Sequence, residues 1–325
     1  MSPVNPVSNG RNVALVLGSG GARGLAHIGV IEALVSEGFT IQAVVGCSMG
    51  ALVGGVYAAG RLQEYKDWTS SLEKSGVLRL LDFSFGNQGL IKGDRVIGVL
   101  KELVGDYRIE DLPIEFTAIA TDLKSQREVW LSRGKLFDAI RASIAIPMLL
   151  TPHRVNGREL VDGGLLSPVP MAPTRQMVVD RVIAVDVNGP VHWRPVMDRE
   201  KENAEDACED EEALASAYGV DVYAQTEDDE KSGHSSLRER LAALWNGDEK
   251  HHPMPANQTS VMELMSQSLD TMHAAMSRMQ LAQDPPDMLI QIPRESCSFH
   301  EYWRAKEMIE LGHKIAMTAL TRMPY

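Results

Sequence analysis

Short apolar runs alternate with segments of helical periodicity from Asn12 to Pro190. The first run, VALVL at Val13–Leu17, is apolar at every position, which is typical of a strand that is buried on both faces of a sheet. Further strands are expected at Ile41–Gly46, Phe116–Leu123, Glu128–Ser132, Arg158–Asp162 and Arg181–Val187. Strands that alternate with helices predict an α/β fold, with a mostly parallel sheet covered by helices on both faces.

Helices are expected between these strands, at Ala22–Gly38, Ala51–Gly60 and Leu136–Ile144. After Ser260, apolar residues recur in steps of three and four, which predicts a helix whose single apolar stripe packs into the core. The stripe consists of Met262, Met265, Leu269, Met272, Met276 and Met279. A late strand at Asp287–Pro293 and a closing helix at His300–Leu320 follow.

The chain has 325 residues, of which 44% are apolar and 23% charged, and this composition indicates a globular protein. The formal net charge of −12 argues against general affinity for nucleic acid. Fourteen acidic and two basic residues lie between Asp198 and Glu230, so this one segment accounts for the whole excess. Because residues 190–258 are acidic and poor in apolar residues, we expect a flexible insertion within a single domain spanning 12–325.

One part of this insertion has an apolar helical face, formed by Leu237, Leu241, Leu244 and Trp245. This face would suit peripheral contact with a membrane, and equally a lid or a packing helix. The chain has no apolar run long enough to cross a bilayer, and its first residues lack the apolar core of a secretory signal. Three scattered cysteines fit a reducing compartment, so a cytoplasmic location is expected, with possible contact at the inner membrane surface. No metal-ligand spacing is present, and no cofactor is expected.

The pentapeptide GCSMG has the form G-x-S-x-G and lies between an expected strand and an expected helix. In that setting the turn is sharp, and Gly46 and Gly50 avoid collisions between strand and helix. The central hydroxyl, Ser48, would be exposed at the end of the sheet, where the dipole of the following helix favours negative charge. Cys47 lies one position earlier and should turn to the other side, as a small buried residue. A plain glycine-rich turn is the alternative for this stretch.

A second glycine-rich stretch, LGSGGARG at Leu17–Gly24, also joins a strand to a helix. A dinucleotide fingerprint would need a third glycine where Arg23 stands, and an acidic residue at the end of the second strand, where Gly46 stands. An oxyanion hole fits better, because successive glycine N–H groups can converge on a developing negative charge. Arg23 would add positive charge beside it.

A serine nucleophile needs a proton acceptor. Of the nine histidines, His27 is expected to serve helix packing, and His153 is the only one kept as a reserve base. Asp162 ends a short strand and is followed by two glycines, so its carboxylate can approach the end of another strand. The alternative for Asp162 is a turn-capping role, which is common for Asp-Gly.

The motifs GSGGARG, GCSMG and DGG together resemble those of the patatin-like phospholipase family, in its small bacterial branch related to neuropathy target esterase. The resemblance covers about Asn12–Asn188 and also includes GLIKGDRV and AIRASIAIP. It implies a three-layer patatin-like fold and a Ser–Asp dyad without histidine, formed by Ser48 and Asp162. It also implies an oxyanion hole at Gly20, Gly21 and Ala22, supported by Arg23. Ser19 stands where the family usually has glycine.

The resemblance implies a serine acyl hydrolase that cleaves lipid carboxylic esters, phospholipid or lysophospholipid, through an acyl-enzyme. Two alternatives stay open: a thioesterase or carboxylesterase for small esters, and a catalytically silent module that binds lipid or a partner protein. The sequence does not distinguish acyl length, head group or oligomeric state.

Overall fold

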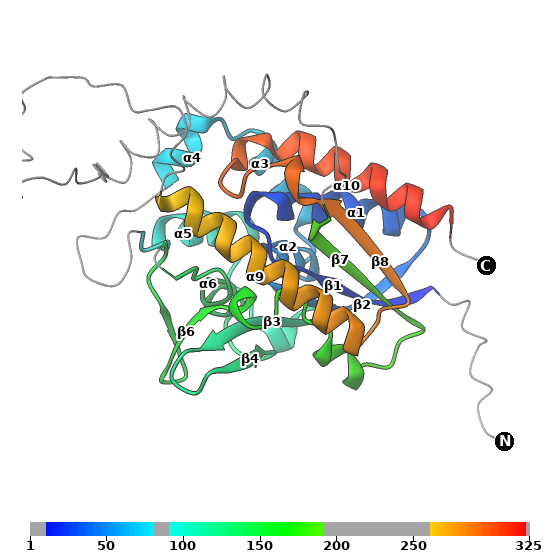
Figure 1. Ribbon diagram of the computed structural model, residues 1–325, viewed down its shortest axis with the longest axis horizontal. Coiled ribbons are helices and arrows are strands. Elements are labelled where there is room, and N and C mark those ends of the chain that lie inside the picture. The colour runs from blue at the N-terminus through cyan, green and yellow to red at the C-terminus, as the bar shows by residue number, and fades with distance from the viewer. Residues whose placement is uncertain (1–10, 81–90, 148, 191–260, 323–325) are drawn as a thin grey trace, which may run out of the picture. The chain divides into compact units, whose positions relative to one another are not determined.

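The computed structural model describes residues 11–80, 91–147, 149–190 and 261–322 (Figure 1). By its contacts the chain divides into two units, one made of Met1–Glu202 and Leu269–Tyr325 and the other of Asn203–Ser268. Of the second unit, only the first turns of helix α9 (Val261–Gln283) are described. Residues 191–258 of the acidic insertion, with the apolar face of Leu237, Leu241, Leu244 and Trp245, lie outside the described residues, so the insertion within a single domain stays a prediction.

A mixed eight-stranded sheet forms the centre of the first unit. Its strands are β1 (Asn12–Leu17), β2 (Thr40–Cys47), β3 (Glu115–Asp122), β4 (Arg127–Leu131), β5 (His153–Val155), β6 (Arg158–Asp162), β7 (Arg181–Gly189) and β8 (Met288–Pro293). The order is β5-β6-β3-β2-β1-β7-β8, with β4 paired to β3 as well. Five neighbouring strands, β3, β2, β1, β7 and β8, run parallel to one another. The strands β4, β5 and β6 pair antiparallel. The mostly parallel α/β sheet is therefore confirmed.

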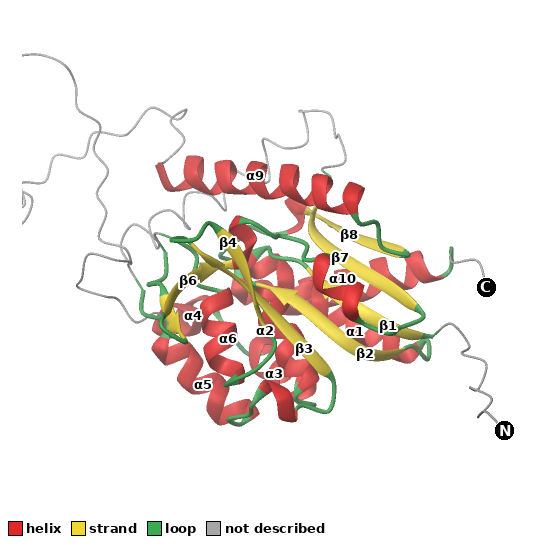
Figure 2. Ribbon diagram, turned by 90° about the horizontal axis from the view of Figure 1, so that it is seen from below, coloured by secondary structure: helices red, strands yellow, loops and turns green. Residues whose placement is uncertain are grey.

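Helices cover both faces of the sheet, as Figure 2 shows with α9 on one side and most of the other helices opposite. The larger core cluster lies on the side opposite α9 and includes Leu15, Ile28 and Phe116. The described helices besides α9 are α1 (Ala26–Ser36), α2 (Met49–Ala58), α3 (Leu62–Ser70), α4 (Lys74–Leu80), α5 (Asp94–Val104), α6 (Leu136–Ser143) and α10 (Ala305–Leu320). None of these helices, nor α9, has the length and apolar character needed to span a bilayer.

The core is much smaller on the side of the sheet where α9 lies. It contains Val16, Val45, Cys47 and Ile119, with Leu281 of α9 packed against it. The prediction that the methionine stripe of α9 packs into the core is wrong at Met272 and Met279, which are 51% and 64% exposed. Among residues 267–283 of α9, the most completely buried is instead Ser277, at 1% exposure. Through Asp270 and Gln280 the helix also bonds to polar groups of two loops, so its buried face is partly polar.

Two strands share one edge of β3, and this arrangement places the site. β2 pairs with β3 as far as Cys47 opposite Ile119, and β6 pairs from Asp162 opposite Ala120. β4 pairs with both of these β3 residues and therefore occupies the other edge. The carboxyl ends of β2 and β6 consequently meet head to head along β3.

Candidate active site

Ser48 occupies a strained turn between β2 and α2. Its backbone has φ 53° and ψ −120°, a positive φ that residues other than glycine rarely adopt. A side chain at Gly46 would overlap the backbone of Gly50 and Ala51, and one at Gly50 would overlap the carbonyl group of Leu17. The two glycines therefore permit the close approach of strand and helix that holds the Ser48 hydroxyl at the end of the sheet.

The structure brings Ser48 and Asp162 into direct contact. The Ser48 hydroxyl donates a hydrogen bond of 2.6 Å to Oδ2 of Asp162. The other carboxylate oxygen, Oδ1, accepts the backbone N–H of Gly164 at 2.7 Å. Because β2 and β6 end at adjacent positions of β3, these side chains meet although 114 residues separate them. Both residues are buried, at 4% and 5% exposure.

Burial sets the proton affinity of Asp162. It raises the pKa of this carboxyl group from 3.8 to about 6, against the opposing effect of the hydrogen bonds from Ser48 and Gly164. Above that pKa the group is mostly ionised, yet it binds a proton far more readily than an exposed aspartate does. The arrangement therefore supplies a hydroxyl beside a carboxylate that is suited to accept its proton.

Ser143, at the end of α6, also contacts the elbow and was not identified from the sequence. Its hydroxyl accepts the backbone N–H of Ser48 at 2.9 Å and donates to the carbonyl oxygen of Ile119 at 2.5 Å. The only signal in the sequence is a serine in the otherwise apolar stretch ASIAI. That signal does not distinguish a supporting hydroxyl from an ordinary small helix residue.

Three backbone N–H groups of the glycine loop (Gly18–Gly24) have acceptors elsewhere in the fold. Gly18 donates to Val185, Ser19 to Pro168 and Ala22 to Phe299, at 2.8–2.9 Å. The expectation that Ala22 is an oxyanion donor therefore needs correction, because the Phe299 carbonyl already accepts its N–H. Within the described part of the chain, the N–H groups of Gly20 and Gly21 meet no acceptor. These two amides are the remaining candidates.

The side chain of Arg23 also differs from the expectation. Its guanidinium group is 4% exposed and forms an ion pair of 2.8 Å with Asp270 of α9. It also donates to the carbonyl oxygens of Arg294 and Gly20, at 3.1 and 3.4 Å. These bonds engage the guanidinium group with α9 and with two backbone carbonyls, and none of them reaches Ser48.

The other candidate side chains lie apart from the Ser48 hydroxyl. Nε2 of His27 is 2.8 Å from the carbonyl oxygen of Gly18, and burial lowers the pKa of this imidazole to about 4. His153 faces Asp138 at 3.7 Å. The Cys47 thiol is fully buried, and burial, together with the charges of Asp162 and Glu128, raises its pKa well above the usual value. Among the described residues, no cluster of histidine, cysteine and carboxylate side chains is arranged to hold a metal ion.

Comparisons with known proteins identify the family of this chain. The model of the family described as patatin-like phospholipase matches residues 15–175. An uncharacterized NTE family protein of Mycobacterium bovis is 40% identical over 332 residues, which cover 96% of this chain and 92% of that protein. Lysophospholipase nte1 of Emericella nidulans is 33% identical over 55% of this chain and 12% of its own length.

A solved structure, VipD from Legionella pneumophila, matches 96% of this chain and 66% of its own chain, with a TM-score of 0.46 and 14% identity. That likeness is too weak to add to the argument. The family model and the full-length likeness to the mycobacterial protein are sufficient. The chain belongs to the patatin-like phospholipase family and is a hydrolase.

Proposed function

We propose that the protein hydrolyses carboxylic esters of lipids, phospholipid or lysophospholipid, with Ser48 as nucleophile and Asp162 as general base. The observation that carries the proposal is the 2.6 Å hydrogen bond from the Ser48 hydroxyl to a buried carboxylate with a raised pKa. A carboxylate with a pKa near 6 is mostly ionised at neutral pH and still able to bind a proton during the reaction.

The reaction then has two steps. As the Ser48 oxygen attacks the ester carbonyl carbon, its proton passes to Asp162; the tetrahedral intermediate collapses, and Asp162 returns that proton to the leaving alcohol. In the second step Asp162 takes a proton from water, and the hydroxide attacks the acyl-enzyme. The fatty acid leaves and the proton returns to Ser48.

The negative oxygen of each intermediate needs hydrogen-bond donors. We assign this role to the backbone N–H groups of Gly20 and Gly21, assisted by the amino-terminal end of α2, which begins directly after Ser48. Main-chain donors held in place by the fold stabilise such charge without reorganisation during the reaction.

The substrate class follows from the family and not from the described pocket residues. Relatives from Emericella nidulans and Saccharomyces cerevisiae are named lysophospholipases, which favours a lipid ester over a thioester or a small ester. Membrane contact through the apolar face around Trp245, and a cytoplasmic location, stay predictions.

A fluorophosphonate probe tests the chemistry directly, because it phosphonylates an activated serine and releases fluoride. We expect wild-type protein to be labelled at Ser48, and Ser48→Ala to lose both labelling and ester hydrolysis while keeping its circular dichroism spectrum. A panel of p-nitrophenyl esters, thioesters, lysolipids and diacyl lipids would define the preference. An unlabelled, inactive wild-type protein would support the silent binding module instead.

A further inference from the structure

Helix α9 bonds to both loops that carry the proposed chemistry. One contact runs from Asp270 to the glycine loop, and the other from Gln280 to the turn that follows Asp162. We propose that α9 acts as a brace that fixes the relative position of these two loops, with Asp270 and Gln280 as positioning residues. The inference rests on the proposed function for its kinetic consequences, but its structural consequences can be measured independently.

At the first contact, a buried charge links the helix to the loop. Two nitrogens of the Arg23 guanidinium group donate to the two oxygens of Asp270, at 2.8 and 3.4 Å, and a third donates to the carbonyl oxygen of Gly20 at 3.4 Å. A guanidinium group that is only 4% exposed needs a paired carboxylate. Asp270 therefore fixes the Arg23 side chain. Arg23 in turn fixes the peptide group between Gly20 and Gly21, beside the N–H groups that are the proposed oxyanion donors.

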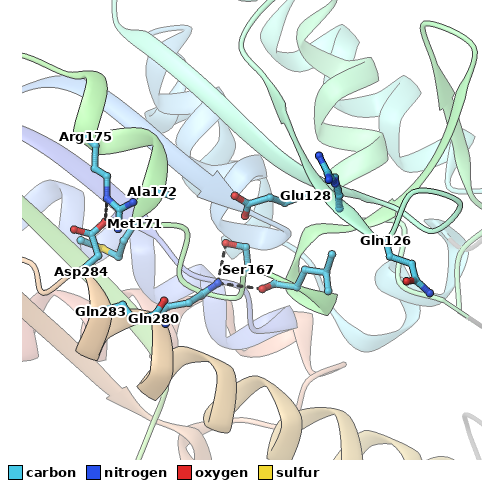
Figure 3. Close-up of a pocket in the computed structure, with 11 residues that line it drawn as sticks. Gln126, Glu128, Ser167, Met171, Ala172, Arg175, Gln280, Gln283 and Asp284 are labelled. Atoms are coloured by element: carbon cyan, nitrogen blue, oxygen red, sulfur yellow. Dashed lines mark hydrogen bonds and ion pairs between the residues drawn. The ribbon is translucent and has the colours of Figure 1, made fainter.

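At the second contact, a single side-chain amide holds the turn after the general base. Nε2 of Gln280 donates to the carbonyl oxygen of Leu166 at 3.0 Å and to the Ser167 hydroxyl at 3.1 Å, as Figure 3 shows. The N–H groups of Leu166 and Ser167 donate to the Gly163 carbonyl oxygen, at 3.1 and 2.8 Å. Gly164, one residue further on, donates to Oδ1 of Asp162. Gln280 thus lies at the end of a short chain of bonds that leads to the carboxylate.

The form of α9 suits this role. Gln280 lies ten positions after Asp270 on the helix, which corresponds to a rise of about 15 Å. The helix buries Ser277 and leaves Met272 and Met279 exposed, and polar side chains make both anchor contacts. Apolar burial is non-directional, whereas hydrogen bonds specify distance and angle. A helix held in this way has its position along the sheet defined by its anchors.

The test uses two variants and a matched control in the full chain. Asp270→Asn removes the charge at the first anchor, and Gln280→Met removes the donor at the second with little change in size. The control is Asp284→Asn, which removes a carboxylate from the residue directly after α9. Asp284 pairs with Arg175 at 2.8 Å and bonds to neither loop that carries the proposed chemistry. Gln280 and Asp284 both line a pocket of about 480 Å³, which leaves room for the altered side chains (Figure 3).

We expect each anchor variant to lower kcat by about tenfold to a hundredfold, since small displacements of catalytic groups have effects of this size. KM should change little, because the brace does not touch substrate. The control should stay within about twofold of wild type, as usual for a partly exposed ion pair. The double variant should lose less than the product of the two single effects, because a brace released at one end no longer works at the other.

Amide hydrogen exchange gives a second readout that does not require activity. Exchange should accelerate at residues 18–24 in Asp270→Asn and at 163–167 in Gln280→Met, and in neither segment of the control. Assays are run below the melting temperature of every variant, so that loss of folded protein does not imitate the effect. If kcat and exchange in both anchor variants match the control, the brace is wrong. If wild-type protein neither reacts with the fluorophosphonate probe nor hydrolyses esters, the proposed function fails. The exchange data would still test whether α9 fixes the two loops.

Discussion

The Ser143 hydroxyl bonds to the backbone N–H of Ser48, at 2.9 Å, and thereby links α6 to the elbow. This bond holds the backbone of a residue whose φ is +53°, a conformation that is strained for residues other than glycine. Because Ser143 donates in turn to Ile119, the elbow is connected through one side chain to β3, the strand that also pairs with β6.

Replacing Ser143 by alanine should therefore reduce both stability and reactivity. The buried N–H of Ser48 would lose its acceptor, at a cost of about 1–3 kcal/mol in the free energy of unfolding. Denaturant unfolding measures that cost, and the rate of fluorophosphonate labelling reports the geometry of Ser48. Ser71→Ala is the control, because Ser71 directly follows α3 and its exposed hydroxyl donates to the carbonyl oxygen of Trp68 in that helix, far from the elbow in sequence. Equal labelling rates in Ser143→Ala and wild type would contradict a supporting role.

Asp162→Asn should abolish ester hydrolysis but stabilise the protein at neutral pH. The folded-state pKa of Asp162 is raised from 3.8 to about 6, so the folded protein binds more protons than the unfolded chain between these values. Its contribution to stability is therefore greatest below pH 4, falls as the pH rises to 6, and is constant above. A shift of this size corresponds to about 3 kcal/mol.

Unfolding at pH 4 and pH 7 checks this prediction. The asparagine variant should gain stability relative to wild type at pH 7, and the gain should shrink at pH 4. His153→Gln serves as the activity control, since His153 faces Asp138 and the prediction gives it no catalytic role. Substantial activity in Asp162→Asn, together with loss of activity in His153→Gln, would identify His153 as the general base in place of Asp162.

The same pKa predicts the pH profile of the reaction. Because Asp162 must be ionised to accept the Ser48 proton, kcat/KM should rise with pH through about 6 and level off at neutral pH. Activity against a soluble p-nitrophenyl ester, measured from pH 4.5 to 8, gives the apparent pKa. The rate of fluorophosphonate labelling should follow the same curve, which separates the ionisation of the enzyme from effects on the substrate. A profile without an inflection near 6 is incompatible with Asp162 as the base.

Cys47 should behave as a packing residue although it adjoins the nucleophile. Its thiol is fully buried, and its raised pKa keeps it protonated. We expect native protein to resist thiol alkylation at this position and Cys47→Ala to keep most of its esterase activity. Cys47→Ser should be less stable than wild type by about 1–3 kcal/mol, because it buries a hydroxyl among apolar side chains. Inactivation of native protein by modification at Cys47 would reopen the choice of nucleophile.

The strand–helix alternation follows from local periodicity, and Ser48 and Asp162, which the structure brings together, were singled out from short motifs that together resemble a known family. The sequence could not predict the partners of Arg23 and Ala22, which are Asp270 and Phe299, more than 240 residues away. The methionine stripe of α9 shows the same limit: its period was real, but burial depends on the surface that the helix meets. Ser143 was missed because only the fold places it beside Ser48.

The end-to-end meeting of β2 and β6 along β3 has a consequence for how the chain can vary. β6 occupies the next position on that edge, so β2 cannot be lengthened by a residue at its carboxyl end without displacing β6. An insertion or deletion at that junction would turn Ser48 or Asp162 to the opposite side of its strand, because neighbouring side chains alternate. Changes in chain length should therefore be tolerated in the surface connections and should disrupt the fold at this junction, where the position of β6 limits the length of β2.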